Sequence, residues 1–458
     1  MKPTAWLCSL FALAAAAFST PAMGAGPISK GPWVQRVTSG SAVVRVEVEP
    51  PAPATLELGV SAAGTSLDGG NRVLESKEVK ALHSFLVEGL EPATRYPITV
   101  RSHGAPKYGA ITTAPRDDSG APFRFLVYGD NRTDDAAHAA VVRAMVSSAS
   151  DFLVHTGDFV SDGGSASQWQ TFFDIEAPLT RERCIFSSVG NHEIVDGAGI
   201  HYLRYFGPTD PSTLPDGGAK AVTPEQLNGT FRWSNARFFL VNGMVDYRTG
   251  PSRDWLASAL TASDGEAGLV WRIVVVHHGL WSSGPHGENQ LLHDAGIPAL
   301  LRAHKVDVVL SGHDHIYERG AADGIPYIVS GGGGAPTYKV KKPREYSRRF
   351  ESVRHFVEAS ASTAAIQFVA TRPDSSVIER CALRKSAGWD CDGETSLVAS
   401  ASASGAAPSS SSSSAPGPAP SRCACRTVGA ASTSIGAGLG GLAGVVLLLA
   451  RRRRSMRH

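Results

Sequence analysis

The chain has few cysteines and little net charge, and both shortages narrow what it can be. Among its 458 residues are 6 cysteines, and the formal net charge is +2. Five arginines lie within the last eight residues, and taking their five positive charges from +2 leaves −3 for the rest of the chain. A body of that charge lacks the basic surface that binds phosphate backbones, so nucleic-acid binding is not indicated.

Only three cysteines lie away from the ends of the chain, which excludes a fold held together by many disulfides. Cys184 opens an apolar run, Cys184–Val189, and we expect it to be a core residue. Cys381 and Cys391 flank a segment that resembles a hairpin. They can pair in an oxidising compartment, and two free thiols are the alternative.

What the chain does have is five short motifs rich in aspartate, asparagine and histidine. These residue types hold hard or borderline divalent and trivalent metal ions. Taken singly, each motif is typical of a turn, a loop or a helix cap. Five of them in one chain favour a site for two metal ions over that reading. The side chains concerned are Asp130, Asp158, Asn191 with His192, His277, and His313 with His315.

Four of the five motifs directly follow apolar runs that are rich in β-branched residues. Such runs are typical of fully buried strands. Ligands that leave parallel strands at their carboxyl ends meet at one edge of the sheet. A helix predicted over Ala136–Ser148 separates the first two runs and indicates a βαβ unit. The runs are Phe123–Tyr128, Phe152–Val154, Ile273–Val276 and Val306–Leu310.

In order, these motifs resemble those of the purple acid phosphatases and the wider calcineurin-like metallophosphoesterases. They read Gly-Asp-Asn-Arg, Thr-Gly-Asp, Gly-Asn-His-Glu, Val-His-His and Gly-His-Asp-His-Ile-Tyr-Glu-Arg. The resemblance implies an α/β fold, a four-layer α/β/β/α sandwich, preceded by an all-β domain. It also implies two bound metal ions, and mixed oxygen and imidazole ligands suit iron, zinc or manganese.

The resemblance assigns a role to each of these side chains. Asp158 bridges the two ions, and Asp130 and His315 complete the set around the first. Asn191, His277 and His313 hold the second ion. His192 faces the substrate and protonates the leaving oxygen after a metal-held hydroxide attacks phosphorus.

The roles of two further histidines, His278 and His286, are less directly indicated by the motifs. Of the adjacent pair, His277 is predicted to be the ligand, because the metal-binding histidine in the family comes first after the strand. His278 then points the other way, with a packing or supporting role. His286 lies where the purple acid phosphatases carry histidines in the substrate pocket, and an ordinary loop histidine is the alternative. The run Gly331–Gly334 either brings backbone close to the site or forms a flexible loop.

The chain departs from the family pattern at two positions. The first motif usually contributes a histidine ligand, and here that position is Arg132. Purple acid phosphatases also carry a metal-binding tyrosine three residues after the bridging aspartate, and here Ser161 stands there. We therefore expect no tyrosinate absorption band and a weaker first metal. Arg132 grips a phosphate oxygen through its guanidinium fork, or instead pairs with Asp134 or Asp135.

The segments on either side of the catalytic region also carry signals. Residues 1–24 read as a secretion signal. Residues 26–115 read as a β-sandwich, in which Trp33 and Tyr96 are core residues. The string Leu90 to Tyr96 resembles the tyrosine corner of fibronectin type III-like domains. The catalytic domain is predicted over 122–397, with helices over 253–260, capped by Ser252, and over 296–303, and a closing β segment over 355–384.

The end of the chain is predicted to attach the protein to a cell surface. Residues 398–421 are rich in Ser, Ala and Pro and read as a flexible linker. Residues 422–458 contain Cys423 and Cys425, an uncharged stretch long enough to span a bilayer, and a terminal arginine cluster. This segment resembles the MYXO-CTERM sorting tail, which implies processing near the cysteines, possible lipid attachment, and display at the outer envelope. A plain transmembrane anchor is the alternative.

Together these observations predict a secreted, surface-anchored hydrolase of phosphomonoesters. Hydrolysis of phosphodiesters or nucleotides by the same centre is the first alternative. A surface binding module without catalysis, suggested by Arg132 and Ser161, is the second.

Overall fold

The computed structural model describes residues 28–59, 71–194, 199–207, 223–340 and 342–393. The predicted secretion signal, the linker and the C-terminal tail with Cys423 and Cys425 lie outside these residues. Within the described ranges, no helix combines the length and the apolar character needed to cross a bilayer.

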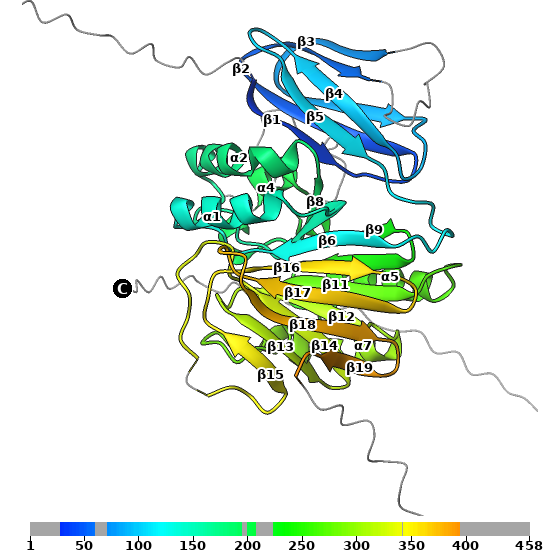
Figure 1. Cartoon of the computed structure of the whole chain (residues 1–458), viewed down its shortest axis with the longest axis vertical. Coiled ribbons are helices and arrows are strands. Elements are labelled where there is room, and N and C mark those ends of the chain that lie inside the picture. Colours follow the sequence, from blue (N-terminus) through cyan, green and yellow to red (C-terminus); the bar gives the residue numbers. More distant parts are fainter. Residues whose placement is uncertain (1–27, 60–70, 195–198, 208–222, 341, 394–458) are drawn as a thin grey trace, which may run out of the picture. The chain divides into compact units, whose positions relative to one another are not determined.

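The N-terminal region consists of five strands, coloured blue to cyan in Figure 1. The order of hydrogen-bonded strands is β1-β2-β4-β5, and β3 pairs with β2. The predicted β structure is thus confirmed, and the fibronectin type III-like character stays a prediction. The tyrosine corner has its expected contact, since the hydroxyl of Tyr96 accepts the Glu91 backbone N–H at 2.9 Å. The strands are β1 (Ile28–Gln35), β2 (Ser41–Leu58), β3 (Arg72–Glu88), β4 (Arg95–Arg101) and β5 (Lys107–Thr112).

Trp33 is fully buried, as predicted of a core residue, but the core that it joins is formed with residues that follow the N-terminal sheet in the chain. Its ring lies against Phe173 and Tyr205, and its indole N–H donates to the Tyr205 carbonyl at 3.1 Å. Arg45 of β2 donates to the carbonyls of Arg204 and Tyr205. The N-terminal sheet therefore shares buried contacts with the residues that follow it.

Two seven-stranded sheets form the centre of the region from residue 123 onward. One has the order β19-β18-β17-β16-β6-β7-β8, and the other the order β15-β13-β14-β12-β11-β10-β9. The first contains β6 (Phe123–Tyr128), β7 (Phe152–His155), β8 (Cys184–Ser187), β16 (Phe356–Ala361), β17 (Ala365–Thr371), β18 (Val377–Arg384) and β19 (Gly388–Cys391). The second contains β9 (Gly229–Trp233), β10 (Ala236–Val241), β11 (Trp271–His278), β12 (Val308–Gly312), β13 (Tyr317–Ala322), β14 (Ile325–Ser330) and β15 (Ser347–Glu351).

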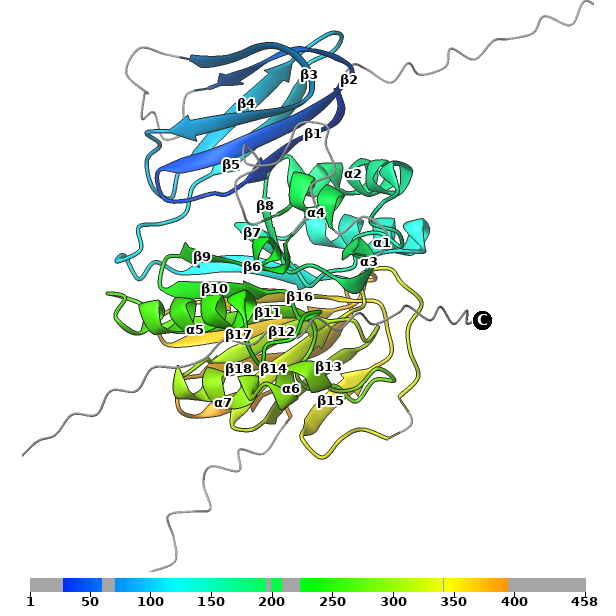
Figure 2. The same ribbon diagram turned by 180° about the vertical axis from the view of Figure 1, so that it is seen from behind.

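Side-chain alternation along β6 shows how the layers stack. Phe125 and Val127 face the core between the two sheets, which they share with Phe238 of β10 and Ile273 of β11. The intervening Leu126 and Tyr128 face the opposite core, formed with helices α1 (Asp135–Val146) and α2 (Ala166–Thr180). A third core joins β10 and β11 to α5 (Pro251–Asp264) and α7 (Ile297–Ala303). These cores make the four layers α/β/β/α (Figures 1 and 2).

The helices lie where the sequence predicts them, but one predicted N-terminal cap is wrong. The helix predicted after the first strand is present, and β6 and β7 on either side of it pair in parallel, so the βαβ unit is confirmed. Ser252 is not a cap as predicted, because Pro251 occupies the first helical position and the cap is Gly250. The helices are α1 (Asp135–Val146), α2 (Ala166–Thr180), α3 (Asn191–Ile194), α4 (Ile200–Tyr205), α5 (Pro251–Asp264), α6 (Gln290–Asp294) and α7 (Ile297–Ala303), with a 3₁₀ turn at Pro224–Leu227.

The closing segment does more than cover an edge. Strand β16 pairs antiparallel with β6, so β16 to β19 supply four of the seven strands of that sheet. Cys381 of β18 and Cys391 of β19 form the predicted disulfide. Cys184 is a free, buried cysteine, as expected of a core residue.

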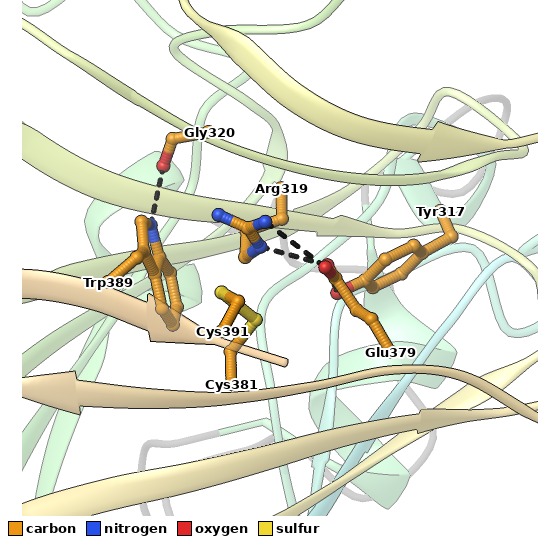
Figure 3. Close-up of a disulfide and its surroundings, with 7 residues drawn as sticks. All are labelled: Tyr317, Arg319, Gly320, Glu379, Cys381, Trp389 and Cys391. Atoms are coloured by element: carbon orange, nitrogen blue, oxygen red, sulfur yellow. Dashed lines mark hydrogen bonds and ion pairs between the residues drawn. A yellow bond between two sulfur atoms is a disulfide. The ribbon is translucent and has the colours of Figure 1, made fainter. Parts of the chain in front are cut away.

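The disulfide lies beside a buried ion pair (Figure 3). The Arg319 guanidinium donates to Glu379, and the Tyr317 hydroxyl donates to the same carboxylate at 2.6 Å. The indole N–H of Trp389 donates to the Gly320 carbonyl at 2.8 Å. The last two strands are thus tied to the second sheet as well as to each other.

We expect the double substitution Cys381→Ser with Cys391→Ser to lower the free energy of unfolding by about 3 kcal/mol. The reason is that closing a loop of this length restricts the unfolded chain. Denaturant unfolding with and without a thiol reductant measures the effect. The reductant should destabilise the wild type by a similar amount and leave the double variant unchanged; equal sensitivity of both proteins would contradict the assignment.

Candidate metal centre

The predicted ligands do meet at the carboxyl ends of the strands that precede them. Asp130 follows β6, Asp158 follows β7, His277 lies at the end of β11, and His313 follows β12. Asp130, Asp158 and His313 all have positive φ angles, of 57°, 59° and 68°. A left-handed conformation is costly for a residue with a side chain and persists only where surrounding contacts hold it. Tight turns at the strand ends therefore aim these side chains.

Four donor groups converge on the position that the sequence assigns to the second ion. Nε2 of His277 lies 3.1 Å from Oδ1 of Asn191, 3.1 Å from Nδ1 of His313 and 3.3 Å from Oδ1 of Asp158. The other ring nitrogen of His277 donates to the Thr156 carbonyl at 2.8 Å. That contact commits Nδ1 to donating, so Nε2 is the ring nitrogen that a metal ion would take in exchange for its proton.

The position assigned to the first ion looks different, because a guanidinium lies against its ligands. Nε2 of His315 is 3.6 Å from Oδ1 of Asp130, and Nδ1 of His315 faces the Pro336 carbonyl at 2.7 Å. Arg132 donates from Nε to Oδ2 of Asp158 at 3.0 Å, and its Nη2 lies 3.4 Å from Nε2 of His315. The alternative predicted for Arg132, a salt bridge with a nearby acid, is thus what the structure shows, with Asp158 as the acid in place of Asp134 or Asp135.

The partners of Asp134 explain why it is not the acid that pairs with Arg132. Asp134 caps α1 through the Ala137 backbone N–H and pairs with Arg354 at 2.8 Å. Its carboxylate is therefore already bound, whereas Asp158 accepts the arginine.

The remaining predicted side chains surround the same centre. His192 directs Nδ1 to the Ser161 carbonyl at 2.7 Å and Nε2 toward Oδ2 of Asp158 at 3.9 Å. His278 packs with its ring 4.4 Å from the ring of His313, in keeping with a supporting role. His286 is exposed, and its ring lies 4.3 Å from that of His313 on the open side of the centre.

The two carboxylates respond in opposite ways to their surroundings. Burial raises the pKa of Asp130 to about 8, and the nearby charge of Asp158 acts in the same direction. Burial would also raise the pKa of Asp158, but His277, His192 and Arg132 outweigh it and hold that pKa below its ordinary value. Asp158 is thus a buried carboxylate kept ionised by cationic neighbours.

The surroundings of the histidines also shift their pKa values in different directions. Burial would lower the pKa of His277, but the charges of Asp158 and Asp130 raise it to about 9. Burial and the neighbouring His277 lower the pKa of His313 to about 2, and burial lowers that of His315 to about 4. His313 and His315 are therefore neutral near pH 7, which is the form that binds metal ions.

The two predicted ion positions differ in whether their side chains can hold a metal ion. At the second position one carboxylate, one amide and two imidazoles present lone pairs to a common point, and three of these groups, Asp158, His277 and His313, have ligand atoms within 4.8 Å of one another. This set suits a borderline divalent ion. At the first position Arg132 already occupies the lone pairs of Asp158 and His315, so the residues present there do not fit an ion as they stand.

Glu193 is a site residue to which the sequence assigned no role. Its buried carboxylate accepts the backbone N–H groups of Asp158, Phe159 and Gly190 at 2.8–2.9 Å. Burial raises its pKa to about 7. Its place in the Gly-Asn-His-Glu motif, next to His192 and two residues after Asn191, was the sequence feature that could have indicated it, since a buried acid needs hydrogen-bond donors.

Tyr338 and Asp314 were also missed. The ring of Tyr338 stacks on His315 at 4.1 Å, and its hydroxyl is 3.4 Å from Nε2 of His286. Asp314 accepts the Ser282 hydroxyl and the His286 backbone N–H, which holds the loop that carries His286. Both contacts join segments far apart in the sequence, so spacing alone gave no signal.

The glycine run Gly331–Gly334 packs tightly against the first-motif loop. A Cβ added at Gly333 would lie 2.4 Å from the Gly129 carbonyl oxygen, and one at Gly334 would lie 2.5 Å from that of Asn131. Close backbone approach, one of the two predicted roles, is therefore confirmed.

Comparison with known proteins agrees with this geometry. Residues 123–317 match the family model of the calcineurin-like phosphoesterases. The chain carries a calcineurin-like metallophosphoesterase domain. Purple acid phosphatase 7 of Arabidopsis thaliana is 25% identical over 272 residues, which cover 51% of this chain and 76% of that protein. Purple acid phosphatase 23 of the same plant is 24% identical over 335 residues, 63% of this chain and 71% of the relative.

Solved structures show the same fold. Purple acid phosphatase PPD1 from yellow lupin seeds has a TM-score of 0.64 at 17% identity, covering 78% of this chain and 74% of that one. PhoD has a TM-score of 0.62 at 14% identity, covering 82% and 94%. The metallophosphoesterase domain and its relatives support a phosphoric ester hydrolase, so that part of the sequence prediction is confirmed.

We expect Glu193→Gln to lower the free energy of unfolding by about 2 kcal/mol and to weaken metal binding. A carboxamide offers one oxygen to three backbone donors, and its own N–H₂ group would face one of them. Thermal unfolding and metal analysis of the dialysed protein measure both effects. The exposed Glu345→Gln is the matched control, and equal behaviour of the two variants would show that Glu193 does not hold the loops.

Proposed function

We propose that the chain hydrolyses phosphomonoesters at this centre, with acid phosphatase-like chemistry. The observation that supports the proposal most is the convergence of Asp158, Asn191, His277 and His313, with His192 beside Asp158. Purple acid phosphatases are among the relatives of the chain, and the activity in their name comes to this chain as part of the proposal.

In this proposal each side chain of the centre has its own role in hydrolysis. Asp158, held ionised in a buried position, fixes the negative charge around which the ligands gather. Arg132 and the exposed His286 border the open side and provide positive charge and a donor for phosphate oxygens. When bound, a metal ion lowers the pKa of water and withdraws charge from a phosphate oxygen.

His192 is placed to handle the proton. Its Nδ1 donates to the Ser161 carbonyl, so Nε2 is the atom that faces the centre. In hydrolysis, the oxygen of water bonds to phosphorus while the bond from phosphorus to the ester oxygen breaks. The departing oxygen needs a proton, and Nε2 of a protonated His192 supplies it.

The same proposal places the protein outside the cytoplasm, as a secreted and surface-anchored enzyme. The disulfide between Cys381 and Cys391 supports this, because such bonds persist in oxidising compartments. The signal-like N-terminus and the sorting-like tail of the sequence point the same way.

We expect His192→Ala to lower kcat/KM for an aryl phosphomonoester by about 10²–10⁴-fold, because general-acid assistance is lost. Metal content should stay at the wild-type level. The measurement combines steady-state kinetics with metal analysis on protein supplied with iron, zinc or manganese. His304→Ala, which removes an imidazole that pairs with Asp264, is the matched control and should keep wild-type kinetics.

Parallel assays with aryl diesters and nucleotides identify the substrate class. A higher kcat/KM for a diester than for a monoester would replace the monoesterase proposal with a phosphodiesterase. Binding of phosphate without turnover of any ester would identify a binding module instead.

A further inference from the structure

The position of Arg132 has consequences for how many metal ions the centre holds. Its side chain is 16% exposed and lies between two ligands that the sequence assigned to a first ion. Nε donates to Oδ2 of Asp158, the oxygen opposite the one that faces His277. The guanidinium therefore occupies the side of the Asp158 carboxylate that an ion at the first position would need.

His315 is engaged in the same way. Its Nδ1 lies 2.7 Å from the Pro336 carbonyl, which can only accept, so Nδ1 carries the proton and Nε2 the lone pair. Nη2 of Arg132 donates toward that lone pair at 3.4 Å. Stacking of Tyr338 on the ring holds His315 in this orientation.

Further contacts keep the guanidinium in place. Nη1 of Arg132 donates to the Thr133 hydroxyl at 3.3 Å, and that hydroxyl is 3.0 Å from the Ser161 hydroxyl. All three guanidinium nitrogens thus have partners around the centre. An arginine stays charged at every working pH, so a metal ion at this position would meet a permanent cation among its own ligands.

The other half of the centre has no such obstacle. Asn191, His277 and His313 lie around the other oxygen of Asp158, Oδ1, which is the oxygen that Arg132 leaves open. The half of the centre around Oδ1 of Asp158 therefore has ligands for an ion, whereas the half around Oδ2 is filled by the Arg132 side chain.

We propose that the centre holds a single metal ion, bound by Asp158, Asn191, His277 and His313. The Arg132 guanidinium supplies the positive charge that a second ion supplies in two-metal sites. The inference rests on the proposed phosphoester hydrolysis and replaces the two-ion expectation. A planar guanidinium is suited to this, because it can hold a carboxylate along one edge and offer its remaining N–H groups to a phosphate oxygen.

The direct test counts ions in the full chain. Equilibrium dialysis against Mn²⁺ gives the stoichiometry, and electron paramagnetic resonance distinguishes an isolated ion from an exchange-coupled pair. We expect one uncoupled ion for each wild-type chain. Arg132→His, which supplies an imidazole in place of the cation, should bind two ions with a coupled spectrum. Arg124→His, the same substitution at an exposed position of β6, should match the wild type.

A second variant covers the case in which Arg132→His does not fold. Arg132→Ala should lower kcat/KM by about 10²–10³-fold, as expected when one charge-stabilising donor is lost. Added guanidinium chloride at low concentration should restore part of the activity of Arg132→Ala and none in His192→Ala. Unchanged activity in Arg132→Ala, or no rescue, would count against the role of the guanidinium.

The outcomes separate this inference from the proposed function. Two coupled ions in the wild type, with hydrolysis, would overturn the single-ion centre and leave the enzyme proposal intact. One ion without turnover of any phosphate ester would overturn the enzyme proposal and leave the ion count standing.

Discussion

The candidate metal centre depends on the buried carboxylate of Glu193, whose oxygens face backbone N–H groups. Glu193 accepts the backbone N–H groups at the start of both the Asp158 turn and the Gly190 turn. Two loops that follow different strands are thereby fixed to one anchor. Because the backbone of Asp158 has a strained left-handed conformation, the positions of its carboxylate oxygens rely on that anchor. Other contacts in the centre add to this frame.

The fold makes such an anchor useful by placing strand ends from two sheets next to one another. Strands β6 and β7 of one sheet supply the aspartates, and β11 and β12 of the other supply His277 and His313. Phenylalanines of the first sheet, such as Phe125 and Phe152, pack against Phe238 of the second. A rigid apolar interface therefore sets the separation of the two ligand groups, while the loops set their direction.

The sequence predicted the strands, and that the six candidate ligand side chains lie near their ends, because both signals are local. An apolar run followed by Asp or His is visible in a few residues, and β6, β7, β11 and β12 all appear where those runs lie. The partner of Arg132 could not be predicted, since Asp158 lies on another strand, 26 residues away. The cap at Ser252 failed because the rigid ring of Pro251 decided where the helix begins. Spacing alone could not show which positions the chain brings together in space.

The contact of Trp33 has a consequence for dissecting the protein. Its ring packs against Phe173 and Tyr205, and Gln35 and Arg45 donate to the carbonyls of Ile185 and Arg204. A fragment that starts at β6 would lose these partners, so the aromatic side chains and the carbonyls would meet water. Because the N-terminal sheet covers Phe173 of α2 and Tyr205 of α4, we expect a fragment that begins ahead of β1 to be more stable than one that begins at β6.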